Sequence, residues 1–90
     1  MSYDDFKALV RELAEQDDLA PHGLLAIPAL RRKCAGRASR AEQDGFLVRL
    51  HGEGTIHLLS HVEFDKLPPA LRQDALHLPS GQALYWIRWL

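Results

Sequence analysis

The chain has 90 residues, of which 47% are hydrophobic and 26% are charged. This is the balance of one soluble globular domain, because chains divide into separate cores only beyond roughly 250 residues. A net charge of −1 excludes a uniformly basic nucleic-acid-binding surface, and a single cysteine, Cys34, excludes an internal disulfide and a cysteine-cluster zinc site.

The first part of the chain predicts an amphipathic helix over residues 3–16. Ser2 followed three residues later by Asp5 indicates a capping box at its start. The apolar residues that follow recur at helical spacing, at Phe6, Leu9, Val10 and Leu13. A proline and a glycine, Pro21 and Gly23, then predict a loop, and a short apolar strand is expected over residues 24–27.

Two further helices are predicted close together, over residues 28–35 and 40–52. Pro28 suits a first helical turn, where its missing N–H costs nothing, and Gly36 stops the first of these helices. Ser39 and Glu42 form a full capping box for the second, which carries an inward apolar stripe. The interpretation is therefore two helices joined by a tight turn.

The remainder of the chain predicts strands. One is expected over residues 55–61 and another, rich in aromatic residues, over residues 83–90. Between them, residues 62–82 read as a long loop with a short helix over residues 69–76. The whole chain, residues 1–90, is therefore expected to be one α+β domain.

This order of elements resembles a winged helix-turn-helix domain. The residues that carry the resemblance are Ile27–Arg32, Ala35–Ala38, Ser39–Leu50 and Gly52–Leu58. It implies three helices followed by a small antiparallel β-hairpin or sheet with a long wing loop, in which the second motif helix enters the DNA major groove.

The basic residues between 31 and 40 favour DNA binding. This stretch contains no acid, and its cations are expected to meet at one corner beside a positive helix N-terminus, ready for phosphates. The expected DNA contacts are Arg31, Arg32, Lys33, Arg37, Ser39, Arg40, Gln43 and Arg49. Of these, Arg40, Gln43 and Arg49 are the candidates for base edges. The expected function is a small protein that binds double-stranded DNA, as a transcriptional regulator.

A second interpretation keeps the same fold but assigns it a different function, protein docking. The outward face of the 40–52 helix is smooth, at Ala41, Gly45 and Val48, and Asp44 beside it repels phosphates. The final strand is apolar on both faces and presents Tyr85, Trp86 and Trp89 as interface candidates. The alternative is therefore an adaptor that docks on protein through either surface without binding DNA. A homodimer or a larger protein partner is expected, and the DNA-binding protein is itself expected to be a dimer.

The sequence does not predict an enzyme, a metal site or a cofactor. His57 and His61 are expected on one strand roughly 13 Å apart, too far to share an ion. Cys34 has no motif-specified base and is expected to be a small buried residue. No apolar run approaches the ~20 residues of a membrane span and no basic leader is visible, so a cytoplasmic protein is expected.

Overall fold

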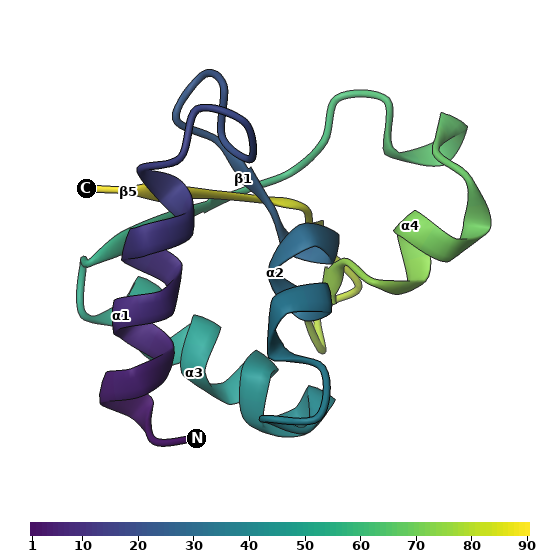
Figure 1. Cartoon of the computed structure of the whole chain (residues 1–90). Coiled ribbons are helices and arrows are strands. Elements are labelled where there is room, and N and C mark those ends of the chain that lie inside the picture. The colour runs from purple at the N-terminus through teal and green to yellow at the C-terminus, as the bar shows by residue number, and fades with distance from the viewer.

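Three helices form one side of the protein. A computed structural model describes all residues, 1–90, and Figure 1 shows α1 (Tyr3–Ala14), α2 (Ile27–Cys34) and α3 (Arg40–Gly52) around a common centre. Both predicted capping boxes are present, at Ser2 with Asp5 and at Ser39 with Glu42. The predicted range of α3 is confirmed, whereas α1 ends two residues earlier than predicted.

The hydrophobic core lies between these helices and a small sheet. The apolar stripe of α1 is buried as its spacing predicts, with Phe6 and Val10 fully enclosed. They meet Leu30 of α2, Leu47 of α3 and Ile87 of the last strand in one cluster of 16 buried residues. Cys34 is fully buried in this cluster, as expected.

The sheet that closes the core has three antiparallel strands in the order β1-β5-β2. They are β1 (Leu25–Ala26), β5 (Trp86–Trp89) and β2 (Ile56–Leu59). β1 is shorter than the predicted range 24–27, and β2 is shorter than the predicted range 55–61. The central strand pairs with both neighbours, and Ile87 stands opposite Leu25 on one side and Leu58 on the other. All three of these side chains are buried on the helical side.

The segment between β2 and β5 is more ordered than the predicted loop. It contains a 3-10 helix (Phe64–Lys66), α4 (Pro69–Gln73) and a hairpin of β3 (Leu76–His77) and β4 (Ala83–Leu84). In Figure 1 it extends beyond α2 on the side away from α1. The short helix predicted over 69–76 ends earlier, because residues 76 and 77 pair with β4 instead.

The predicted strand 83–90 is divided at Tyr85 into β4 and β5. The Tyr85 N–H donates to the carbonyl of Leu59, and its own carbonyl accepts from the N–H of Ile27. At this residue the chain therefore leaves the β3–β4 hairpin and enters the three-stranded sheet. No helix in the structure has the length and apolar character to cross a membrane.

The orientation of α3 is open to a direct test at two adjacent residues. Leu47→Ala should lower the free energy of unfolding by about 2–5 kcal/mol, because Leu47 is fully buried and truncation leaves a cavity. Val48→Ala should change it by less than about 0.5 kcal/mol, because half of Val48 is exposed. Urea denaturation followed by circular dichroism measures both, and similar losses would contradict this orientation.

Candidate interaction surfaces on the second and third helices and the last strand

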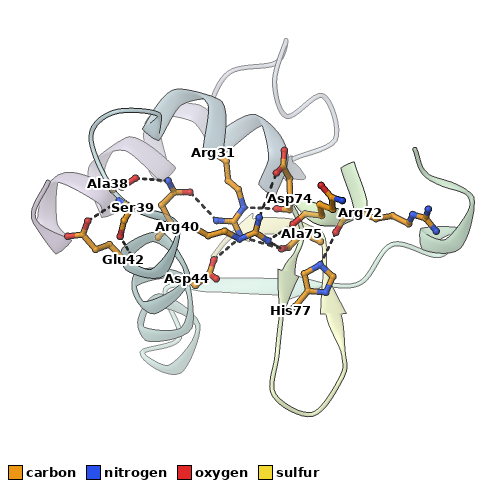
Figure 2. Close-up of polar contacts among 12 residues, drawn as sticks. Arg31, Ala38, Ser39, Arg40, Glu42, Asp44, Arg72, Asp74, Ala75 and His77 are labelled. Atoms are coloured by element: carbon orange, nitrogen blue, oxygen red, sulfur yellow. Dashed lines mark hydrogen bonds and ion pairs between the residues drawn. The ribbon is translucent and has the colours of Figure 1, made fainter. Parts of the chain in front are cut away.

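The most basic part of the sequence is divided by the fold into an internal part and an external part. Arg31 belongs to the internal part, with a side chain that is only 9% exposed. Its guanidinium donates to Gln43 Oε1 at 3.0 Å and to Asp44 Oδ1 at 2.7 Å, both on α3 (Figure 2). It also donates to the carbonyls of Asp74 at 2.6 Å and Ala75 at 3.3 Å.

Arg40 reaches the same stretch of backbone from the first turn of α3. Its Nη2 donates to the carbonyl of Gln73 and, at 3.0 Å, to that of Ala75, while Nη1 lies 3.8 Å from Asp74 Oδ1. Figure 2 shows both guanidinium groups converging on residues 74 and 75. These two arginines therefore bind the end of α4 to α2 and α3.

Gln43 does not face solvent, contrary to its expected role at base edges. It is 5% exposed, donates to the carbonyl of Ala38 at 2.9 Å and accepts from Arg31. Its position near the edge of the apolar stripe of α3 turns it into the α2–α3 junction. The expected contribution of Arg31 to an external cationic corner needs the same correction, because the guanidinium is buried and donates four hydrogen bonds to protein groups.

Arg49, the third candidate for base edges, lies against α1. Its guanidinium carbon is 3.7 Å from the centre of the Tyr3 ring, and Nε is 3.5 Å from Glu53 Oε2. The Tyr3 hydroxyl donates to the same carboxylate, and this hydrogen bond lowers the pKa of Glu53. Arg49 is therefore part of a contact between α1 and the end of α3.

The hydroxyl and the backbone N–H of Ser39 are both used in capping α3. Its hydroxyl accepts from the Glu42 N–H at 3.1 Å, and its own N–H donates to the Glu42 carboxylate at 2.9 Å. The backbone donor at Ser39 lowers the pKa of Glu42, so that this carboxylate stays ionised beside the N-terminus of α3. A carboxylate at this position competes with any incoming phosphate.

Three of the expected DNA contacts remain exposed and form no ion pair. They are Arg32 and Lys33 at the end of α2 and Arg37 in the turn. The N-terminal amine approaches this turn, where it donates to the Arg37 carbonyl at 3.4 Å. The external cationic surface is thus smaller than the five-residue corner expected from sequence.

The outward face of α3 is the smooth surface that the sequence predicts. Ala41, Gly45 and Val48 are all exposed. A methyl group added to Gly45 would meet no atom within 4 Å, so nothing in the chain covers this face. None of the three side chains can donate to a base edge or pair with a phosphate.

The aromatic residues of the final strand differ in their exposure. Tyr85 is 6% exposed, which removes it from the predicted interface, because its backbone lies where the two small sheets meet. Trp89 packs partly against the core, with the Arg11 guanidinium 6.0 Å from its ring centre. Trp86 is half-buried and stacks on His61 with ring centres 5.6 Å apart.

The remaining chemistry-bearing side chains include two histidines that stack on each other and one buried cysteine. His51 and His57 stack with ring centres 5.9 Å apart, and no group of three potential metal ligands occurs in the chain. Burial raises the pKa of the Cys34 thiol, which makes this buried group a weaker nucleophile.

Comparison with known proteins adds no relative, since no family model, curated protein or solved structure matches this chain.

The acceptors at residues 73–75 that hold Arg31 and Arg40 could not be predicted from the residue types. Most of them are backbone carbonyls at residues 73–75, and any residue type carries a carbonyl. Gln43 and Asp44 also accept from Arg31, but of the groups at residues 73–75 only the Asp74 carboxylate, which pairs with Arg40, belongs to a side chain. Only the path of the chain after β2 brings these groups together.

Because Arg31 is buried and Arg32 is exposed, substitutions at the two positions should change the free energy of unfolding by different amounts. Arg31→Met should lower the free energy of unfolding by about 3–5 kcal/mol, because it leaves Asp44 and two carbonyls without their buried partner. Arg32→Met removes an exposed cation and should cost less than about 0.5 kcal/mol. Urea denaturation of both variants measures the difference, and an equal, small loss would show that the Arg31 contacts do not support the fold.

Proposed function

We propose that this chain is a winged helix-turn-helix domain that binds another protein through the exposed face of α3. The proposal of this fold draws support from the order α1-β1-α2-α3-β2-β5 and from the sheet order β1-β5-β2. In this arrangement α3 takes the place of the helix that commonly enters DNA. The surface chemistry of α3 then decides which partner it suits.

The observation that carries the proposal is the composition of the α3 face. Its centre consists of Ala41, Gly45 and Val48, whose small side chains let another backbone approach closely without leaving a buried charge unpaired. Half of the Val48 surface is exposed, and the gain from burying it favours an apolar partner. The partner is a second protein chain, either a larger protein or another copy of this one.

The side chains needed for sequence-specific DNA reading are already committed elsewhere. Arg40 donates to backbone carbonyls, Gln43 is buried, and Arg49 lies on Tyr3. A helix inserted in the major groove requires such donors free on its outer face. Gln43 is buried, and the exposed guanidinium groups of Arg40 and Arg49 are held by contacts within the chain, which favours protein docking over base recognition.

Charge and bulk on the α3 face should abolish partner binding without unfolding the domain. The variants are Gly45→Arg and Val48→Glu, both at exposed positions. The purified tagged domain is used to capture partners from a lysate of its own source, in salt raised to about 0.5 M, where phosphate-driven contacts are screened. Arg88→Glu, which changes an exposed charge on β5, is the matched control.

We expect the wild-type chain and the control to retain the same discrete protein at high salt, and both α3 variants to lose it. A benzophenone amino acid at position 48 should crosslink that protein, or a second copy of the chain, on illumination. Capture that persists in Gly45→Arg and Val48→Glu would contradict docking through α3. Circular dichroism of each variant establishes that the fold is intact.

DNA binding is a second candidate function, favoured by the three exposed and unpaired cations Arg32, Lys33 and Arg37. They suit contacts with phosphates, which position a regulator on duplex DNA without reading its sequence. Asp44 is paired with Arg31 and so weighs less against this function than its charge alone indicates. DNA binding through phosphates and protein docking through α3 differ in how strongly their affinities depend on salt concentration.

Three phosphate contacts give a slope of about −2.7 in log affinity against log salt concentration, so duplex affinity should fall about 40-fold between about 50 and 200 mM salt. Reversing Arg32 and Arg37 to glutamate should abolish gel retardation of a random duplex. Arg11→Glu with Arg88→Glu makes the same change in net charge elsewhere and should have a smaller effect. Absence of retardation by the wild-type chain at low salt would exclude this second function.

A further inference from the structure

We propose that a hollow beside Trp86 binds one large apolar side chain of a peptide segment that carries lysine or arginine next to it. The hollow has a volume of about 340 Å³ and is lined by Leu19, Pro21, His22, Leu24 and Trp86. It lies between the connection that follows α1 and the first residue of β5. This site goes beyond the α3 surface and lies on different elements.

Trp86 is held in place as one wall of the hollow. Its backbone pairs with Ala26 of β1 and Leu59 of β2, in the centre of the sheet. One ring face stacks on His61 at 5.6 Å and 19°, and the Tyr85 ring meets it nearly perpendicularly at 4.8 Å. A fixed aromatic wall binds an apolar side chain at little cost in conformational freedom.

The opposite wall is apolar and belongs to a loop. Leu19 and Leu24 are both half-buried, so each presents hydrocarbon surface without being enclosed by the core. His22 is the only titratable residue that lines the hollow. The hollow has the size and composition of a pocket for a single leucine, phenylalanine or tryptophan side chain.

The charge near the hollow determines which peptide residue is preferred beside the inserted apolar side chain. Asp17 and Asp18 immediately precede Leu19, are exposed, and form neither an ion pair nor a side-chain hydrogen bond. Asp17 and Asp18 adjoin the lining residue Leu19 in the chain, and their negative charge favours a cationic residue beside the inserted anchor. The other hollow against a tryptophan, beside Trp89, has a weaker bias, because both acids and bases line its α1 wall, at Asp4, Lys7, Arg11, Glu12 and Glu15.

Selection from a phage-displayed library of random dodecamer peptides tests this site. The wild-type chain should enrich sequences with one large apolar residue adjacent to lysine or arginine. The variant with Asp17→Lys and Asp18→Lys should retain the apolar preference and enrich aspartate or glutamate instead. Enrichment of unrelated sequences, or an unchanged flank preference in the reversed variant, would overturn the proposal.

The enriched peptide is then synthesised, and its affinity is measured by fluorescence anisotropy. Trp86→Ala and Leu24→Glu should each weaken binding by about 30-fold or more, the effect of removing a central anchor contact. Leu24 is outside the sheet, so its variant remains informative if Trp86→Ala does not fold. Equal affinity for wild type and Leu24→Glu would place the peptide elsewhere and reject the site.

Val48→Glu should bind the selected peptide as tightly as the wild-type chain, because α3 does not line the hollow. Failure of this peptide site is therefore distinguishable from failure of the α3 surface. Light scattering of the wild-type chain examines the competing occupant, a second copy. A dimer that Leu24→Glu converts to monomer would overturn the peptide proposal in favour of self-association.

Discussion

The requirement to satisfy the buried guanidinium of Arg31 constrains much of this structure. A charge removed from water is tolerated only with a close partner and a full set of hydrogen bonds. Asp44 supplies the opposite charge, Gln43 a side-chain oxygen, and Asp74 and Ala75 supply carbonyls. Because these groups come from α3 and from the end of α4, Arg31 fixes three segments relative to one another.

This arrangement also determines what the surface offers to a partner. Arg40 binds the same backbone stretch as Arg31, so Arg31 is buried and Arg40, although half exposed, is held by contacts within the chain. The outward face of α3 is left with small side chains and one half-exposed valine, Val48. The stabilisation of the α2–α3 junction thus leaves a smooth surface rather than a hydrogen-bonding one.

The sheet produces a second and separate surface. Its inner face closes the core through Ile87 and Leu58, whereas Trp86 is held on the strand between β1 and β2 but is not enclosed. The apolar loop residues Leu19 and Leu24 stand beside it. The surfaces on α3 and at Trp86 are therefore built from different elements.

The sequence alone determined the local elements and their inner faces. The capping boxes at Ser2 and Ser39, the apolar spacing of α1 and the range of α3 follow from interactions within a few residues, which a linear pattern records. Exposure of Ala41, Gly45 and Val48 was predicted for the same reason, since helical periodicity separates inside from outside, whereas burial of Cys34 was expected from its residue type. Only the tertiary structure decided which cations face solvent. The acceptors of Arg31 and Arg40 are largely backbone carbonyls more than thirty residues away, and these leave no trace in residue type. The division of the last strand at Tyr85 was likewise decided by distant pairing, with Leu59 and Ile27.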